Sequence, residues 1–210
     1  MVATLERIAR VEAIPLSPIH TNQASTILAR AYLNDPAYVE LIPNERDRMS
    51  MLNTLWSGVV TYCLGFGEVY ATPAVEGVAC WLSPDHPEAS MWGDLPTRMA
   101  LPRAVMMFSG AERKRFMAAL EYMDELRRSL IPSPHWYMWG VGVDPPHRGK
   151  GIGGALIAPV LERAAASGTA CYLETLNEGN LPLMQEHGFH VVHSGLAPGL
   201  NLPIWALRTG

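Results

Sequence analysis

The stretch Val141-Gly-Val-Asp-Pro-Pro-His-Arg-Gly-Lys-Gly-Ile-Gly-Gly-Ala-Leu156 decides how this chain folds. Its pattern predicts a strand, then a turn that carries Arg148 and Lys150, and then a helix. The turn contains four glycines, at positions 149, 151, 153 and 154. Such a turn exposes several backbone N–H groups at once, and the start of the helix adds unpaired amides and the positive end of its dipole. The stretch therefore predicts a phosphate site between a strand and a helix.

The composition restricts the class of protein and its partners. Of the 210 residues, 49% are hydrophobic and 17% are charged, which is enough apolar content to bury the core of one folded domain. The net charge of −4 argues against nucleic acid as a partner, because phosphate backbones bind to clustered basic surfaces. The densest basic cluster, Arg113 to Arg115 with Arg127 and Arg128, alternates with glutamates and is interpreted as the exposed face of a helix.

The sequence shows neither a membrane segment nor an export signal. No apolar run approaches the ~20 residues that cross a bilayer, so we expect no membrane association. The N-terminal segment is charged and contains no apolar core of a secretory signal. Cys63, Cys80 and Cys171 are far apart and odd in number, which fits buried thiols in a reducing compartment better than disulfides or a zinc site. These features together predict a cytoplasmic protein.

The remaining sequence alternates between helical and strand periodicity. The predicted helices cover residues 24–32, 49–63, 110–130, 153–167 and 180–187, and the predicted strands cover residues 11–16, 68–71, 77–82, 136–143, 170–176, 189–194 and 203–208. The segment Asn34-Asp-Pro36 predicts the end of the first helix. Residues 84–134 hold several prolines and one helix with a capping box formed by Ser109 and Glu112, which predicts a helical insertion. We therefore expect a single α/β domain over residues 1–210.

Three kinds of phosphate carrier and one purely structural role compete for the glycine turn. A nucleotide P-loop is excluded, because Lys150 is followed by Gly151 instead of the Ser or Thr that binds magnesium. A dinucleotide fingerprint is present in Gly149, Gly151 and Gly154, with Glu174 where a ribose-binding acid is expected. However, the first glycine lies too far from the strand, and too little chain follows to complete a dinucleotide-binding sheet. A dinucleotide-dependent oxidoreductase is retained as an alternative, as is a turn whose glycines only allow close packing.

The third candidate carrier is coenzyme A. The turn reads Arg148-Gly-Lys-Gly151-Ile-Gly153, and it is followed by Leu173-Glu-Thr175, Asn180-Leu-Pro182 and Gly188-Phe189. In these motifs residues 136–189 resemble the acetyl-CoA-binding core of the Gcn5-related N-acetyltransferase (GNAT) superfamily. The succession of the motifs along the chain is similar to that of puromycin N-acetyltransferase-like members. The resemblance implies an α/β fold with a mixed, mostly antiparallel sheet, helices on both faces and the insertion between strands 3 and 4. It also implies an enzyme, an N-acetyltransferase that uses acetyl-CoA.

The resemblance further implies the chemistry and the residues that perform it. A primary amine, of a small molecule rather than of a peptide, would attack acetyl-CoA directly in a ternary complex, and Glu174 would take the proton of the amine. A backbone N–H in the strand would stabilise the developing oxyanion. The residues implied in acetyl-CoA binding are Val141, Gly142, Val143, Arg148, Gly149, Lys150, Gly151, Ile152, Gly153, Gly154, Asn180 and Met184.

One position departs from the family pattern. A tyrosine four residues before the Gly-Phe pair commonly protonates the leaving thiolate, but Met184 occupies this position and has no proton to donate. Three possibilities stay open. The thiolate leaves unaided; or Tyr137, Tyr32 or His187 replaces the missing tyrosine; or the chain is a catalytically weak acyl-CoA-binding or regulatory module.

The acceptor side has no sequence signature. Tyr32, Tyr38 and Trp81 are the aromatic candidates for contact with the substrate. Six methionines between Met91 and Met123 either line a pocket for an apolar amine or fill gaps in the core. The three histidines closest to the C-terminus do not share one face, so no metal site is expected. The oligomeric state, monomer or homodimer, is left open.

Overall fold

The computed structural model describes residues 11–86 and 106–210. Of the predicted features, the first part of the helical insertion and the methionines that fall in it lie outside the described residues. Within the described ranges, no helix is both long enough and apolar enough to cross a membrane.

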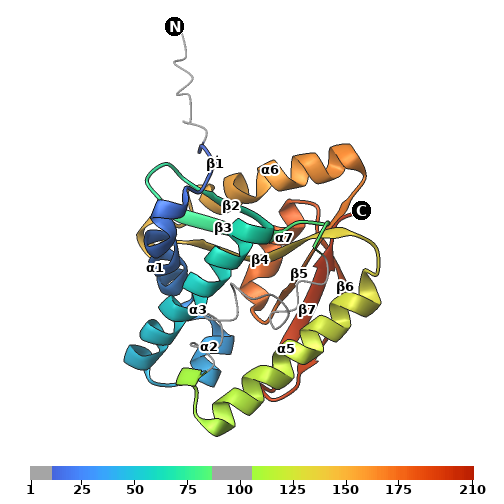
Figure 1. Ribbon diagram of the computed structural model, residues 1–210. Coiled ribbons are helices and arrows are strands. Elements are labelled where there is room, and N and C mark those ends of the chain that lie inside the picture. Colours follow the sequence, from blue (N-terminus) through green and yellow to red (C-terminus); the bar gives the residue numbers. More distant parts are fainter. Residues whose placement is uncertain (1–10, 87–105) are drawn as a thin grey trace, which may run out of the picture.

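A seven-stranded mixed sheet runs through the molecule (Figure 1). Its strands are β1 (Ile14–Pro15), β2 (Gly67–Ala71), β3 (Gly77–Leu82), β4 (His135–Val143), β5 (Ala170–Thr175), β6 (His190–Ala197) and β7 (Leu202–Arg208). They are ordered β1-β2-β3-β4-β5-β7-β6. Every neighbouring pair is antiparallel except β4 and β5, which are parallel. The predicted mixed, mostly antiparallel sheet is confirmed.

Helices cover both faces of this sheet (Figure 1). They are α1 (Thr21–Tyr32), α2 (Pro36–Leu41), α3 (Glu45–Phe66), α5 (Gly110–Leu130), α6 (Ile152–Ser167) and α7 (Leu181–Glu186), with short 3-10 helices η1 (Pro18–His20), η2 (Pro145–His147) and η3 (Glu178–Asn180). Helices α1 and α3 pack on one face, and α6 packs on the other. The glycine turn therefore lies between β4 and α6, where the sequence predicts it.

The two faces of the sheet bury separate cores. On one face, Leu28 of α1 and Val59 of α3 belong to the same buried cluster as Val78 of β3. On the other face, Leu156 of α6 is buried together with Ala79. Neighbouring residues of a strand point to opposite faces of the sheet. Helices cover both faces at β3, and all six of its residues are therefore buried.

Helix α5 confirms the predicted helical insertion between β3 and β4. The Oγ of Ser109 accepts from the backbone N–H of Glu112 at 3.3 Å, and the Glu112 carboxylate accepts from the backbone N–H of Ser109 at 2.7 Å. This is the capping box that the sequence predicts. The helix contacts α2 and β6, and its Phe116 and Leu126 belong to the same buried cluster as Leu28 and Val59.

Helix α2 was not predicted. Helix α1 ends at Tyr32, close to the predicted stop, but a second helix then begins at once. Pro36 occupies its first turn, where a missing N–H costs nothing, and Oδ1 of Asp35 accepts from the backbone N–H of Ala37 at 3.1 Å. The segment Asn34-Asp-Pro36 therefore ends one helix and begins the next.

The three cysteines are free and buried, as predicted.

Candidate active site

The parallel strands β4 and β5 separate in the middle of the sheet. On β4, pairing with β5 extends only from His135 to Tyr137, although β4 continues to Val143. A β-bulge lies just beyond this point and leaves Trp139 without a partner on β3. The second half of β4 consequently has one edge that no strand of the described residues covers.

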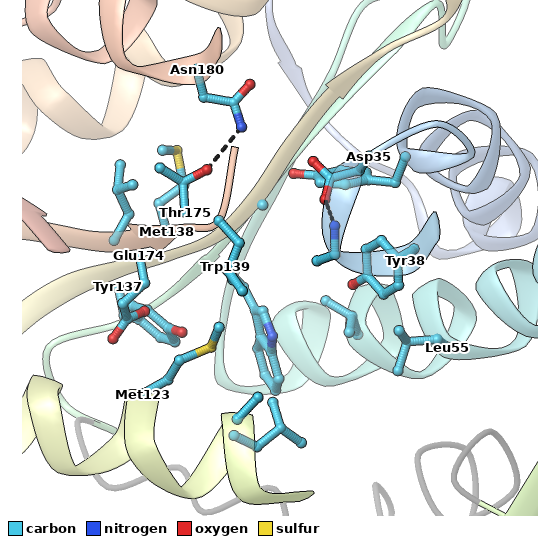
Figure 2. A pocket seen from close by; sticks show the side chains of 18 of the residues that line it. Asp35, Tyr38, Leu55, Met123, Tyr137, Met138, Trp139, Glu174, Thr175 and Asn180 are labelled. Atoms are coloured by element: carbon cyan, nitrogen blue, oxygen red, sulfur yellow. Dashed lines mark hydrogen bonds between the residues drawn. The ribbon is translucent and has the colours of Figure 1, made fainter. Parts of the chain in front are cut away.

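A cavity of about 370 Å³ occupies this opening. Its walls come from β4 and β5, from the α1–α2 junction, and from α3, α5 and α7. Figure 2 shows Glu174 and Tyr137 on one side of Trp139, and Asp35 and Tyr38 on the other side. Most of the described lining residues are apolar or aromatic, and a few polar groups lie among them. This combination is typical of a small-molecule site.

The open edge of β4 is oriented for pairing. The Val141 carbonyl accepts from the Tyr32 hydroxyl at 3.1 Å, and the Val143 carbonyl accepts from Nε of Arg148 at 3.3 Å. In an extended strand the N–H and C=O of one residue point the same way, so the amides of these two valines also face away from β3. The predicted cofactor segment Val141, Gly142 and Val143 thus presents backbone groups to the opening.

Glycine in β4 allows the helices to approach this edge closely. A Cβ at Gly140 would lie 2.5 Å from the Trp56 ring and 3.0 Å from the Tyr32 hydroxyl. The rings of Trp56 and Tyr32 also contact each other, with centroids 4.6 Å apart. The missing side chain at position 140 therefore lets α1 and α3 bring two aromatic rings onto the cavity.

The glycine turn between β4 and α6 exposes its backbone. Gly149 and Gly151 have φ angles of +75° and +74°, which favour glycine, and a Cβ at either position would meet no atom within 4 Å. Gly151 is the N-cap of α6, and Ile152 is its first residue. Amides at the start of α6 thus lie next to open space, in an arrangement that suits a phosphate group.

The two basic residues of the turn differ in their contacts. Nη2 of Arg148 donates to the Ala31 carbonyl at 2.7 Å, in addition to the bond that Arg148 makes with Val143. Its guanidinium therefore joins the turn to the C-terminal end of α1. Lys150 is exposed.

Asn180 and Met184 line the cavity from the β5–α7 side. Nδ2 of Asn180 donates to Oγ1 of Thr175 at 3.0 Å, and the Met184 side chain is buried. His187, one of the candidate proton donors, does not line the cavity. Its ring lies against the first turn of α6, where a Cβ at Gly154 would come within 2.4 Å of Nε2.

Glu174 points from β5 into the cavity. Its Oε1 is buried and has no hydrogen-bond partner in the described part of the chain. Burial raises the pKa of Glu174 to about 7, although the hydroxyls of Tyr137 and Tyr172 and the guanidinium of Arg127 act in the opposite direction. A carboxylate with this pKa can accept and release a proton near neutral pH.

Arg127 corrects an interpretation made from the sequence. It was assigned to the exposed face of a helix, but it is only 8% exposed and lines the cavity. Its guanidinium pairs with Asp124 and lies over the Tyr137 ring, 5.3 Å from the centroid. The alternation of charges along α5 does not predict the burial of Arg127, because that burial arises where α5 covers the cavity.

Two of the three predicted acceptor residues lie on the cavity wall. Tyr32 and Tyr38 both line it, with ring centroids 6.1 Å apart. Asp35 lies between them in the sequence and also lines the cavity. Its Oδ2 accepts from Nδ2 of Asn177 at 3.2 Å, which ties the α1–α2 junction to the chain segment after β5. Burial raises the pKa of Asp35 despite this bond and the bond from Ala37.

Trp81 does not fit its predicted role. It is fully buried in the core beneath α6 and does not line the cavity. Alternation along β3 is the reason, since Leu82 reaches the cavity while Trp81 points to the opposite face. Trp56 and Trp139 line the cavity instead. The helical apolar stripe around Trp56 indicates a core position. Trp139 lies two residues after Tyr137, so strand alternation places both on the same face.

Within residues 11–86 and 106–210, no group of three or more His, Cys, Asp or Glu side chains could hold a metal ion.

Known proteins share the fold of this chain and its family pattern. The model of the acetyltransferase (GNAT) family matches residues 75–189. An uncharacterized N-acetyltransferase of Schizosaccharomyces pombe is 25% identical over 173 residues, which cover 80% of this chain and 69% of that protein.

Solved structures share the fold. One is a histone acetyltransferase HPA2 and related acetyltransferase from Corynebacterium glutamicum, with a TM-score of 0.67 and 22% identity. The superposition covers 95% of this chain and 96% of the Corynebacterium chain. A putative arylalkylamine N-acetyltransferase 7 of the yellow fever mosquito Aedes aegypti has a TM-score of 0.62 at 13% identity, over 93% of this chain and 86% of its own. With a family match over more than half of its length, this chain is an acetyltransferase that belongs to the GNAT family.

Proposed function

We propose that this acetyltransferase transfers an acetyl group from acetyl-CoA to a primary amine of a small molecule, by direct attack of the amine in a ternary complex. The observation that carries the proposal is the Glu174 carboxylate, which lines the cavity where β4 and β5 separate and whose pKa burial raises to about 7. A carboxylate is costly to bury, so its place on the cavity wall favours a ligand that donates a hydrogen bond or a proton.

The residues of the turn and of β4 fit acetyl-CoA. The backbone amides between Arg148 and Gly154 would bind its diphosphate, because Gly149 and Gly151 lie beside open space at the start of α6. The free edge of β4 at Val141 and Val143 would pair with the amides of its pantetheine arm. Bound there, acetyl-CoA supplies an acetyl group activated as a thioester.

The side chains of the cavity would move the proton of the amine. An amine attacks only when it is neutral, and most primary amines are protonated at pH 7. The Glu174 carboxylate accepts that proton, and its pKa of about 7 keeps part of it ionised under these conditions. Tyr137 and Tyr32 also line the cavity and carry hydroxyl groups that can donate to a departing thiolate.

The comparisons support an amine acceptor and the size of the cavity supports a small one. The mosquito protein is named an arylalkylamine N-acetyltransferase, and the Corynebacterium protein is titled a histone acetyltransferase. A volume of about 370 Å³ lies within the range of small-molecule pockets.

We further assign the chain to the puromycin N-acetyltransferase-like branch, on the motifs Leu173-Glu-Thr175 and Asn180-Leu-Pro182. In this proposal residues 1–210 form one acetyltransferase domain, with its acetyl-CoA-binding core at 136–189 and its insertion at 84–134.

A second candidate function is that of a catalytically weak acyl-CoA-binding module. Met184 favours it, because this residue lies on the cavity wall where family members commonly place a tyrosine, and it cannot protonate a thiolate. The two functions differ in whether an amine releases free thiol from acetyl-CoA.

Substitution of the carboxylate tests the proposal. In an assay of thiol release with acetyl-CoA and a panel of primary amines, we expect Glu174→Gln to lower kcat by about 100-fold or more, because the amide cannot take a proton. The KM for acetyl-CoA should change little. Glu162→Gln, an exposed substitution on α6, serves as the control. An unchanged kcat for Glu174→Gln would reject the assigned base, and tight acetyl-CoA binding without thiol release from any amine would favour the binding module.

A further inference from the structure

The carboxylate of Asp35 lies on the cavity wall without a positive partner. Its two oxygens accept from the backbone N–H of Ala37 at 3.1 Å and from Nδ2 of Asn177 at 3.2 Å. Both donors are neutral, so they hold the carboxylate in place without removing its charge. No ion pair among residues 11–86 and 106–210 includes Asp35. A carboxylate withdrawn from water in this way is stabilised by a cation, and it has further lone pairs to accept from one.

The lining arginine lies on the other side of the cavity. Arg127 pairs with Asp124 and lies over the Tyr137 ring. Figure 2 shows Tyr137 beside Glu174, and it shows Asp35 on the opposite side. Against this one arginine the described lining contains four acids: Asp35, Glu121, Asp124 and Glu174. The Asp35 side of the cavity therefore carries a negative charge that the lining arginine does not offset.

Aromatic rings lie close to the Asp35 carboxylate. Tyr32 and Tyr38 flank it in the sequence, and their ring centroids are 6.1 Å apart. Burial raises the pKa of both tyrosines, and the nearby charge of Asp35 raises it further. A phenol oxygen can accept from an ammonium group, and the face of an aromatic ring attracts a cation. The carboxylate and the two tyrosines together form a wall that suits a positively charged group.

We propose that the acceptor carries two cationic groups joined by a hydrocarbon spacer, and that Asp35 binds the group that is not acetylated. The inference rests on the proposed function and names the substrate class for the same site. The reacting amino group lies on the Glu174 side of the cavity, and the second group, an ammonium or a guanidinium, lies against Asp35 and Tyr38. Apolar lining residues such as Leu55 and Met123 suit the methylene groups of the spacer.

Two amines of equal size test this preference. Pentane-1,5-diamine and hexylamine have the same number of non-hydrogen atoms and differ only in whether the far end is an ammonium group or a methyl group. With acetyl-CoA, we expect kcat/KM for the diamine to be about 10-fold higher or more, because only the diamine places a positive charge at Asp35. Equal or lower kcat/KM for the diamine would overturn the inference.

Substitution of the carboxylate tests the assigned residue. Asp35→Asn removes the charge and keeps the shape, and asparagine is as good an N-cap as aspartate, so helix α2 should stay intact. We expect the ratio of diamine to hexylamine kcat/KM to fall by about 10-fold. Because the ratio compares two substrates on one protein, a general loss of activity cancels from it.

Asp47→Asn is the matched control, since it makes the same change at an exposed position of α3. We expect it to leave the ratio as in the wild type. An unchanged ratio in a folded Asp35→Asn protein, or a fall of equal size in both variants, would contradict Asp35 as the group that binds the second charge.

Binding separates this inference from the proposed function. Calorimetry of each amine with the CoA-loaded wild-type protein needs no turnover. Tighter binding of the diamine without thiol release would support the second charge site and reject the acetyltransferase reaction on these amines. Turnover of both amines at equal kcat/KM would reject the inference and leave the proposed function standing. Equal binding, or no binding, of both amines without turnover would reject both.

Discussion

At the scale of the residue, the environment of Glu174 determines what it can do. Burial disfavours the charged form, while two nearby hydroxyls and one guanidinium favour it, and the balance raises the pKa to about 7. An ordinary exposed glutamate would be fully ionised at neutral pH and a weak base. Glu174 combines partial ionisation with greater basicity, which suits a group that takes protons from ammonium ions.

The pH dependence of the reaction follows from this pKa. The active form of an acid used as a base is its ionised form, which gains population as the pH rises through the pKa. We therefore expect kcat/KM for the amine to rise with pH and to level off above about pH 7. Arg127→Met should move the inflection to higher pH, because the guanidinium lowers the pKa of Glu174. The measurement is a series of initial rates against pH.

Arg128→Met is the matched control for this profile. Arg128 also pairs with Asp124, but its side chain is 66% exposed, and it does not line the cavity. We expect its profile to coincide with that of the wild type. A shift of equal size in both variants would assign the effect to Asp124 or to the net charge of α5, and would contradict a direct influence of Arg127.

Individual site residues could be predicted from the sequence only in part. Glu174 was found from a family motif on a predicted strand, and the structure places it in the cavity. Tyr32 and Tyr38 also lie there, but Trp81 points to the other face of the sheet. A period-two pattern separates the two faces of a strand without stating which face holds the cavity. Arg127 was missed for a related reason, since its burial depends on how α5 is placed.

At the scale of the element, the C-terminal turn of α1 is bonded to β4 and to the glycine turn. Arg30 pairs with Asp144 at 3.0 Å. The next two residues of α1 bond to Arg148 and to Val141. Three consecutive residues of one helix thus fix the open edge of β4 and the start of the phosphate site in one arrangement.

Gly140 is where this arrangement is most sensitive to substitution. We expect Gly140→Ala to lower the free energy of unfolding by about 1–3 kcal/mol, because the new methyl group would overlap the Trp56 ring. Replacement of Trp56 by Leu opens that space, so the double variant should lose less stability than the sum of the single variants. Urea denaturation of the four proteins measures this coupling.

Gly65→Ala provides the comparison. Gly65 lies in α3, and a Cβ there would meet no atom within 4 Å, so we expect stability to stay the same or to rise slightly. Strictly additive effects at Gly140 and Trp56 would show that close packing of α3 on β4 is not the reason for glycine at position 140.

Elements with strong periodicity are predicted well, whereas two short elements, α2 and β1, are not. The helices α3 and α6 and the strands β3 and β4 lie close to their predicted ranges. Helix α2 was missed because its six residues are too few to show a period, and β1 pairs over two residues instead of the six predicted. The extent of β1 depends on its pairing with β2, a segment distant in the sequence.

At the scale of the whole molecule, the site exists because segments far apart in the sequence meet around β4. The strand order places β4 in the centre, with α1 and α3 on one face and α6 on the other (Figure 1). The insertion helix α5 adds the wall that carries Met123 and Arg127. The sequence predicted the glycine turn and the order of the elements, but the cavity required the separation of β4 from β5, which no local pattern encodes.

Acetyl-CoA binding by the amides of the glycine turn is the central claim, and calorimetry tests it directly. We expect CoA to bind the wild-type protein at least about 100-fold more tightly than pantetheine, which lacks the diphosphate. Gly151→Val should weaken CoA binding strongly, whereas Gly168→Val, at a similar positive φ at the other end of α6, should not. Absence of CoA binding to the folded wild-type protein, or equal CoA affinity in both valine variants, would contradict the account.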